Sequence, residues 1–216
     1  MTISTALKLK QPLGSSDFFN RIEQHKAEFR NNILFKSMSQ GRFSKTACDK
    51  FLFHQQCFSN HFQRLIMLRS AFCKQVHFEN LFYEHLMEEI GHHKILENER
   101  NKIDLEKDII VEALCMWFPH QMFSSSPLEQ LVIVNYGIET AAFIIYEYAI
   151  PVFDPERQSE YFKIHEIHDA HHQNMGQNLL MNLTSGEYEQ LIAVLDDTWA
   201  VLNALMARFC ILSLED

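Results

Sequence analysis

Apolar residues recur at helical spacing along most of the chain. One series, spaced by threes, fours and sevens, begins after Ser44: Phe51, Phe58, Phe62, Leu65 and Phe72. A second series lies near the C-terminus: Tyr188, Leu191, Leu195, Trp199, Leu202, Leu205 and Phe209. No segment alternates apolar and polar residues between turn signals, as a half-buried strand would. The pattern therefore predicts an all-α protein.

Residues that begin and end helices divide this pattern into about seven helices with short connections. We expect them at about residues 16–38, 44–72, 78–98, 104–119, 126–150, 154–182, and from 184 to near the C-terminus. Gly41 is suited to a left-handed C-cap. Ser126-Pro127-Leu128-Glu129 combines an N-cap, a proline at the first position and an acid at the third, and Thr184 to Glu187 forms a capping box. Pro119 and Pro151 are expected to stop their helices.

Composition adds that the whole chain, 1–216, is one domain with a bulky core. The sequence is 47% hydrophobic, has 18 Phe, and contains few Gly (6) and Pro (5). The apolar helical stripes predict a set of core residues: Phe51, Phe58, Phe62, Ile133, Phe143, Leu195, Trp199 and Leu202.

Charge and cysteine content exclude several classes of function. The net charge is -9 with no basic stripe, which argues against nucleic-acid binding. The N-terminus has no apolar targeting segment, and the most apolar stretch, 131–150, is interrupted by Asn135, Glu139 and Glu147, so we expect no membrane span. Five cysteines without CxxC spacing suit reduced thiols in a cytoplasmic protein.

Histidine is the most informative residue type, with 12 copies. In the segment HEIHDAHH, His165, Asp169 and His172 stand at i, i+4 and i+7. On a helix these three side chains fall within about 60° of one another. Histidine runs also occur on solvated faces, but two imidazoles and a carboxylate that converge suit iron, manganese or zinc.

The same spacing occurs a second time in HLMEEIGHH, where His85, Glu89 and His92 repeat it. Glu89 and His92 also form the Glu-x-x-His motif that helical di-iron proteins direct inward. Glu88 and His93 are neighbouring alternatives, and Glu88 would replace Glu89 if the helix were slightly rotated. Two unrelated surface faces would seldom share such a pattern.

Glu139 lies in the apolar segment LVIVNYGIETAAFIIY, which predicts a buried central helix. Burying a carboxylate without a partner costs on the order of several kcal/mol. Taken alone, Glu139 could equally pair with an Arg or a Tyr hydroxyl. Beside two His/acid triplets, a bridging role between two metal ions is favoured, and Gly137 would leave room for close approach.

The predicted metal ligands are therefore three carboxylates and three histidines: Glu89, His92, Glu139, His165, Asp169 and His172. His85 is either an extra ligand or a hydrogen-bond donor to a ligand. Oxygen donors combined with imidazoles favour iron over copper or a closed zinc site. His54 and His61 have no acid at a suitable spacing, so we expect packing or surface roles for them, and Cys115 has no paired His or Asp, so we expect it in the core.

These motifs resemble the di-iron oxidase and oxygenase branch of the haem-oxygenase-like superfamily, the CADD-like proteins. The segment NILFKSMSQGRFSKTACDKFLFHQQCFSNHF is similar to the first two helices of that superfamily. Glu89-x-x-His92, Glu139 and the His165, Asp169, His172 triplet match the branch's metal signature in order and spacing. Some members place their Glu seven residues before the His, where this chain has His85, which leaves that ligand open between Glu89, Glu88 and His85.

The resemblance implies a haem-oxygenase-like bundle that uses two iron ions and O2 to oxidise a small organic substrate. Amines, amino acids and fatty acids are the substrate classes of the branch. An external electron donor and a homodimer are further partners compatible with it.

Three alternatives remain at this stage. A haem-binding oxygenase would use His25, in RIEQHKAEF, as the axial ligand. A TenA-like thiaminase, a cofactor-free hydrolase, would need a nucleophilic cysteine on the central helix, which has none. A non-catalytic helical module would carry a structural or incidental metal ion.

Overall fold

The computed structural model describes residues 12–215, and the side chains of residues 167–170 lie outside the description. The elements are, in chain order, α1 (Ser15–Phe29), α2 (Ile33–Ser39), α3 (Lys45–Phe72), α4 (Val76–Glu89), α5 (His92–Glu99), α6 (Ile109–Ser124), α7 (Pro127–Leu131), the π-helix η1 (Val132–Glu139), α8 (Thr140–Phe153), α9 (Glu160–His172), the 3-10 helix η2 (Gln177–Leu180) and α10 (Ser185–Leu214). No strand occurs between residues 12 and 215. The predicted all-α class is confirmed.

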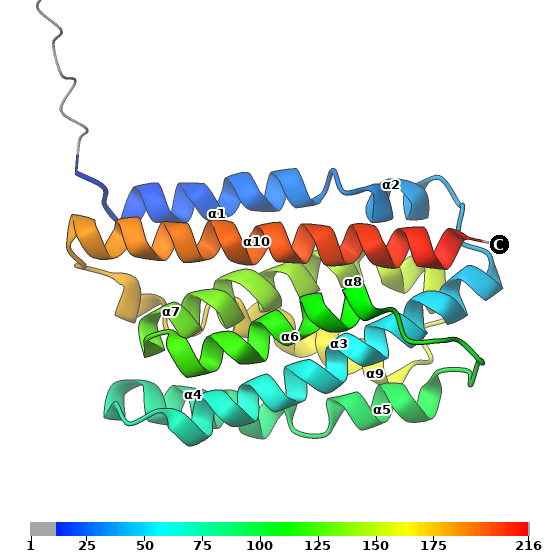
Figure 1. Ribbon diagram of the computed structural model, residues 1–216, viewed down its shortest axis with the longest axis horizontal. Helices are drawn as coiled ribbons and strands as arrows, with labels where there is room; N and C mark the ends of the chain where they lie inside the picture. The colour runs from blue at the N-terminus through cyan, green and yellow to red at the C-terminus, as the bar shows by residue number, and fades with distance from the viewer. Residues whose placement is uncertain (1–11, 216) are drawn as a thin grey trace, which may run out of the picture.

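Helix α10 runs the length of the bundle and contacts helices on both of its sides (Figure 1). It packs against α1 and α2 on one side and against α3, α6 and η1 on the other. Helices α4 and α5 lie at the opposite edge of the bundle from α1. Helix α5 contacts α3 and α9, and α9 contacts α8 and η1, so these elements enclose one region of the interior.

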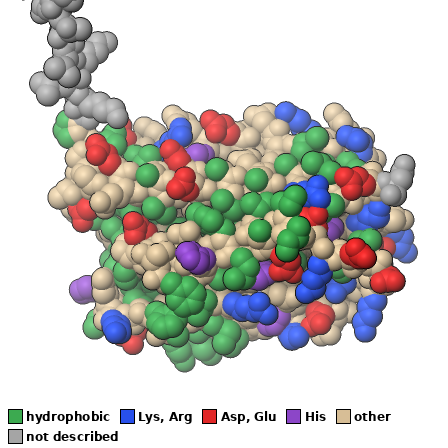
Figure 2. All heavy atoms as spheres, in the orientation of Figure 1, with side chains coloured by type: hydrophobic (Ala, Val, Ile, Leu, Met, Phe, Trp, Pro, Cys, Tyr) green, Lys and Arg blue, Asp and Glu red, His purple; other side chains and the backbone are tan. Residues whose placement is uncertain are grey.

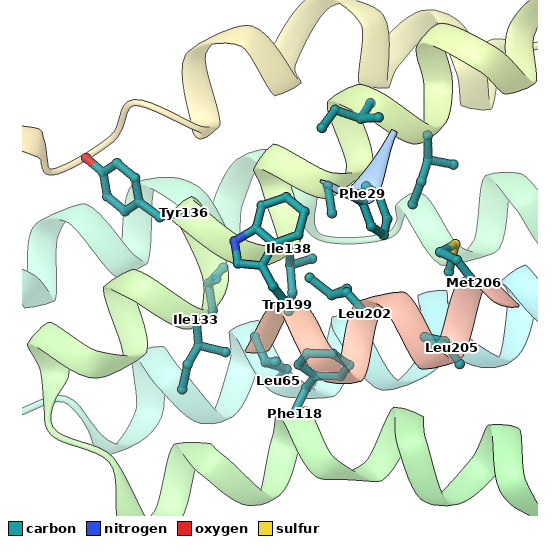
Figure 3. Packing of buried hydrophobic residues seen from close by; sticks show 14 of the residues in the cluster. Phe29, Leu65, Phe118, Ile133, Tyr136, Ile138, Trp199, Leu202, Leu205 and Met206 are labelled. Carbon is teal, nitrogen blue, oxygen red and sulfur yellow. The ribbon is translucent and has the colours of Figure 1, made fainter. Parts of the chain in front are cut away.

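The hydrophobic core is centred where α10 meets η1, α3 and α6. Figure 3 shows Trp199 and Leu202 of α10 beside Ile138 of η1, with Leu65 and Phe118 close by. Five of the predicted core residues are fully enclosed: Phe51, Ile133, Leu195, Trp199 and Leu202. Trp199 also packs against Phe29 in a T-shaped arrangement, with 5.2 Å between ring centroids. The apolar periodicity therefore identified the faces of α3, η1 and α10 correctly.

Three of the predicted core residues behave differently. Phe58 and Phe62 are only partly buried, because they line a pocket described below. Phe143 is 39% exposed and the prediction that it is core was wrong. It lies on a face of α8 that borders a surface pocket with Arg157 and Glu166. A helix that is apolar on nearly every face gives no periodic signal of which face is outside.

Two predicted helices are each broken into two. The first is interrupted between Phe29 and Ile33, where the Asn32 side chain accepts a hydrogen bond from Leu34 N at 3.0 Å and starts α2. Gly41, with φ of 66°, follows α2 as predicted. The third is interrupted at Gly91, whose φ of 99° is left-handed and separates α4 from α5. A short polar residue or a glycine within an apolar pattern was enough to break the helix.

Other predicted boundaries were also wrong. Pro119 and Pro151 lie inside α6 and α8, which continue to Ser124 and Phe153. A proline removes one hydrogen bond to the preceding turn but leaves the following residues free to stay helical. Helix α9 begins only at Glu160, because Asp154 accepts hydrogen bonds from the backbone of Gln158 and Ser159 in a loop.

The central segment 127–153 begins as predicted and then departs from α geometry. The Ser126 hydroxyl accepts from Glu129 N, and Glu129 accepts from Ser126 N. From Val132 to Glu139 the backbone forms a π-helix, a rare geometry that is frequent at functional sites. Gly137 lies within it against Thr198 of α10, where a Cβ would stand 2.4 Å from Thr198 Cγ2. Glycine is required here by close helix–helix contact.

Two helical stretches, Pro127–Phe153 and Ser185–Leu214, are long and apolar enough to cross a membrane by length and composition. The expectation that no segment would be apolar enough was too strict. The core helix of a soluble protein passes the same test, and 78% of the apolar window in the first stretch is buried inside the bundle. The finding is therefore weak evidence for a membrane span.

The face of the molecule in Figure 2 carries scattered charges and one group of hydrophobic side chains at its lower left. Exposed apolar residues near the ends of α3 and α6 include Phe72 and Phe123, whose ring centroids are 5.5 Å apart. Apolar patches of this kind are common in protein interfaces. The homodimer stays a prediction.

We predict that Gly137→Ala destabilises the fold by about 1–3 kcal/mol, because the new methyl group overlaps Thr198 Cγ2. Adding Thr198→Ser should restore part of the loss, since serine lacks that methyl group but keeps the hydroxyl bonded to Val194 O. Gly186→Ala, where nothing lies nearby, is the control. Urea unfolding measures all four proteins, and equal stability of the Gly137→Ala and Gly186→Ala variants would contradict the close contact.

Candidate metal centre

The junction of α4 and α5 places two acids and a histidine at the interior. Helix α4 ends with Glu88 and Glu89, and α5 begins with His92. The left-handed Gly91 between them donates its N–H to Gln63 Oε1 of α3 at 2.7 Å. Glu-x-x-His is therefore not one continuous helical turn, yet His92 Nδ1 still lies 2.9 Å from Glu89 Oε2.

A first group of ligand-type side chains comes from three elements: His85 and Glu89 of α4, Glu139 of η1 and His172 of α9. One ligand atom from each lies within 4.8 Å of all the others, and all four side chains are buried. His172 Nδ1 is 3.2 Å from Glu89 Oε1 and 3.6 Å from Glu139 Oε2. His85 Nε2 is 3.1 Å from Glu139 Oε1.

A second group shares one residue with the first and consists of Glu89, His92 and His165. The His92 and His165 rings lie 5.2 Å apart between centroids. His165 Nδ1 donates a hydrogen bond to Tyr161 O at 2.7 Å, which leaves Nε2 as the ring nitrogen that can bind a metal ion. Glu89 thus lies between the two groups, one carboxylate oxygen facing His172 and the other facing His92.

Hydrogen bonds orient the histidine rings toward these groups. Glu88 accepts from His172 Nε2 at 2.7 Å, which turns His172 Nδ1 toward Glu89 and Glu139. A carboxylate that holds the far nitrogen of an imidazole is a common partner of metal-binding histidines. The geometry therefore places Glu88 as the orienting acid and Glu89 as the acid inside the cluster.

Arg69 of α3 determines which ring nitrogen of His85 carries the proton. Its guanidinium is 1% exposed, donates to His85 Nδ1 and to Asn135 Oδ1, and lies 4.2 Å from the Phe82 ring centroid. Arginine has no acceptor, so His85 Nδ1 must accept and the proton of the neutral ring must be on Nε2. His85 therefore directs the N–H of Nε2 toward Glu139 Oε1, 3.1 Å away, although this contact falls short of hydrogen-bond geometry.

Charges in the cluster balance without an added ion. Burial alone would raise the pKa of Glu139, but its contacts with His172 and His85 outweigh burial and lower the pKa. The same balance, with His172 and His92 as partners, holds the pKa of Glu89 well below its usual value. Burial opposes the charging of His172, yet Glu139 and Glu89 raise its pKa to about 11. Burial lowers the pKa of Arg69 to about 9, so it stays charged at neutral pH.

Several buried polar atoms of the cluster nevertheless make no hydrogen bond within the described part of the chain: Glu89 Oε1, Glu139 Oε1 and His85 Nε2. Such atoms are expensive to bury. Unsatisfied carboxylate oxygens beside imidazole nitrogens form a donor set that suits a divalent cation such as iron. The residues present therefore fit a metal ion.

All five predicted ligands with described side chains occur in the two groups: Glu89, His92, Glu139, His165 and His172. The sixth, Asp169, lies outside the described side chains. His93 instead contacts Gln63 Oε1 at 3.0 Å and belongs to neither group. Sequence reasoning missed Arg69 and Asn135, which link α3 and η1, and Asn135 also donates to His172 O. The sequence did offer a signal for Arg69, because it follows Leu65 by four residues on the apolar face of α3, where a charged side chain needs a buried partner.

A small pocket adjoins the second group and reaches toward α3. Its volume is about 30 Å³, and its lining includes Phe58, Phe62, Ile138, Ala142 and Tyr146 beside Glu89, His92 and His165. The volume exceeds the roughly 10–15 Å³ that one water molecule needs. The pocket therefore admits a molecule of the size of water or O2 next to the cluster.

We predict that Arg69→Leu costs about 3–5 kcal/mol of stability in the metal-free protein, because it leaves two buried carboxylates short of a positive charge. Combining it with Glu139→Gln should reduce the cost, since one of those charges is then gone. Arg64→Leu, on the exposed side of α3, is the control. Chemical unfolding of the single and double variants measures the coupling, and strictly additive losses would contradict the charge balance.

Comparisons with known proteins agree on the fold. No family model matches the chain. A solved domain of unknown function with a haem-oxygenase-like fold from Shewanella denitrificans is similar, with a TM-score of 0.72, 12% identity, and coverage of 92% of this chain and 93% of that chain. A TenA homologue from Pseudomonas syringae gives a TM-score of 0.67 at 17% identity and 91% coverage of both chains. A TenA homologue from Pyrococcus furiosus gives 0.55 at 14%, covering 93% and 96%.

A relative by sequence is the uncharacterized protein RP592 of Rickettsia prowazekii. It is 33% identical over 186 residues, which cover 86% of this chain and 89% of the relative. Identity at this level over nearly the full length of both chains shows common descent. The chain therefore belongs to the same family as the rickettsial protein and has the haem-oxygenase-like fold.

Proposed function

We propose that this protein is a non-haem di-iron oxidase or oxygenase that uses O2 to oxidise a small organic substrate. The observation that carries the proposal is the pair of overlapping ligand groups that share Glu89. A single-metal site needs only one such group. A carboxylate between two groups is what a two-metal site requires.

In this proposal one iron ion is held by Glu89, Glu139 and His172, and the other by Glu89, His92 and His165. Asp169 completes the second set on the basis of its spacing from His165 and His172. Two ferrous ions supply the electrons that reduce O2.

The remaining polar residues of the site position the ligands. Glu88 accepts a hydrogen bond from His172 Nε2, and Tyr161 O accepts one from His165 Nδ1, so each ring presents its other nitrogen to the cluster. His85 holds Glu139 from the side of Arg69. These partners give the carboxylates and imidazoles one orientation before any ion binds.

The pocket beside the cluster limits what can approach it. Phenylalanine, isoleucine and alanine side chains form one part of its wall, which favours an apolar part of a substrate, and the cluster residues with glutamine, serine and tyrosine side chains form the rest. A substrate larger than the pocket requires some lining side chains to move. Amines, amino acids and fatty-acid-like molecules remain the proposed substrate classes, with an external electron donor and a cytoplasmic location as further expectations.

Haem binding through His25 does not fit the structure. His25 is 6% exposed, its Nε2 lies 2.6 Å from Asp196 Oδ1, and its ring stacks on Trp199 at 5.7 Å between centroids. An axial ligand needs a free nitrogen that faces an open plane. In His25, Asp196 of α10 occupies Nε2 and Trp199 of α10 covers the ring face.

A cofactor-free hydrolase is the alternative that two TenA-homologue neighbours favour. The pocket beside the cluster has no cysteine among its lining residues, so the nucleophile expected for such an enzyme is missing there. The cluster of carboxylates and histidines would also have no role in that chemistry. Metal content and O2 consumption separate the two functions.

We predict that anaerobic loading with Fe(II) gives about two iron ions per chain, and that exposure to O2 then consumes it with a transient visible absorption. His172→Ala should lower the iron content by about one and abolish the transient. His171→Ala is the matched control, since the neighbouring histidine of α9 is exposed.

Iron analysis, an oxygen electrode and circular dichroism make these measurements. Retention of both iron ions and of O2 consumption in His172→Ala would refute the proposed site. Full iron loading with no reaction toward O2 would favour the non-catalytic module instead.

Metal affinity should rise with pH. Because the pKa of His172 in the metal-free protein is about 11, the ring is protonated at neutral pH and an ion must displace that proton. Affinity for Fe(II), measured anaerobically, should increase about tenfold per pH unit between about pH 6 and 8. Calorimetry in buffers of different ionisation enthalpy should show about one proton released through this residue. An affinity that does not change over this range would contradict the charged state of His172.

A further inference from the structure

A second cluster of ligand-type side chains lies elsewhere along α3. Cys57 and His61 stand one turn apart on α3, and Glu112 comes from the facing helix α6. One ligand atom from each residue lies within 4.8 Å of the other two. None of the three belongs to the groups around Glu89. Successive residues of α3 line two different pockets, Phe58 and Phe62 the first, Cys57 and His61 the second.

His61 is buried, yet only one of its ring nitrogens has a hydrogen bond. Its side chain is 7% exposed, and Nε2 lies 3.0 Å from Glu112 Oε2. Nδ1 has no hydrogen-bond partner in the described part of the chain. A buried imidazole nitrogen without a partner costs free energy that a ligand would recover. This is the observation that points to a ligand at the cluster.

The thiol at this position differs from an ordinary core cysteine. A hydrogen bond from Cys115, followed by the contact with His61, lowers the pKa of Cys57 to about 6 in spite of burial. Cys115 is fully buried on α6, and the neighbouring Cys57 together with burial raises its pKa, so it stays the donor of the pair. A cysteine sulfur, an imidazole and a carboxylate therefore converge, and Cys57 is the thiol of the pair that loses its proton more readily.

We propose that Cys57, His61 and Glu112 bind one divalent metal ion of the zinc type, separate from the carboxylate-histidine centre. Thiolate sulfur, imidazole nitrogen and carboxylate oxygen are the three kinds of zinc ligand. Ligands at about 2.0–2.3 Å from one tetrahedral ion lie roughly 3.3–3.8 Å from one another. Because the present separations are 4.8 Å or less, any two ligand atoms need to approach by about 1.5 Å at most.

Three protein ligands leave one position of a four-coordinate ion open. The cluster borders a pocket of about 200 Å³ that can supply a water or small ligand at that position. Lys107 lies 3.7 Å from Glu112 but is 82% exposed, so its weak ion pair does not prevent Glu112 from binding an ion. Arg64 and Arg100 also line the pocket and favour an anion as the fourth ligand.

Cobalt(II) distinguishes this site from the first, because only a thiolate ligand gives a sulfur-to-cobalt charge-transfer band in the near ultraviolet. The groups around Glu89 contain no cysteine and cannot give the band. Titrating the full-length, metal-free protein with Co(II), in a thiol-free phosphine reductant, should produce the band, with an amplitude at saturation that corresponds to about one thiolate-bound ion per chain. Excess Zn(II), which is spectroscopically silent, should remove it.

Matched variants locate the band. Cys57→Ser should abolish it, whereas Cys48→Ser, which removes another partly buried thiol of α3, should leave it unchanged. Glu112→Gln should weaken Co(II) binding at this site by at least about tenfold. Loss of a residue that only hydrogen-bonds to a metal ligand already costs about that much affinity. His172→Ala should keep the band.

Circular dichroism confirms that each variant is folded. No band in the wild type overturns the proposal, as does a band that survives Cys57→Ser. Loss of the band in His172→Ala with Cys57 intact would show that the cobalt ion binds elsewhere, and would also overturn it.

Discussion

Two carboxylates buried next to each other, Glu89 and Glu139, impose the main constraint on this structure. Each is almost fully enclosed, and two negative charges in that environment would be strongly unfavourable without compensation. The protein supplies it with Arg69 from α3 and a protonated His172 from α9. Four elements, α3, α4, η1 and α9, are thereby tied to one point. The metal-free protein can fold because the compensating charges are its own.

Irregular backbone places these groups. The left-handed Gly91, two residues after the end of α4 at Glu89, lets α5 begin with His92, so acid and histidine face each other across a break. The π-helix carries both Asn135, which holds Arg69 and the carbonyl of His172, and Glu139. Gly137 allows this segment to lie against Thr198 of α10. The two departures from regular α-helix occur where the candidate ligands are, as expected where geometry serves a site.

Structural similarity alone does not decide the chemistry. The solved neighbours are 12–17% identical to this chain and show the fold only. One fold hosts unrelated functions, so particular residues decide which chemistry a member of it performs. His25 is taken by Asp196 and Trp199, the first pocket lacks a cysteine, and Glu89 lies between two groups of metal-ligand type.

The sequence by itself determined the helical class, the buried faces of α3 and α10, and the identity of the acids and histidines that gather in the interior. Periodicity and spacing carry that information, because residues three, four and seven apart share a face of a helix whatever surrounds it. The chain pattern also identified the N-cap at Ser126 and the left-handed Gly41. It could not separate Glu88 from Glu89, which differ by one residue but make opposite contacts with His172.

Contacts between helices decided the rest. The role of His85 follows from Arg69, which is on a different helix and contacts its Nδ1. His61 seemed to lack an acid because Glu112 is 51 residues away in sequence and adjacent only across the α3–α6 interface. Phe143 is exposed because an apolar helix does not indicate its own outer face. Partners brought together by packing leave no periodic trace in the chain, so only the tertiary structure shows them.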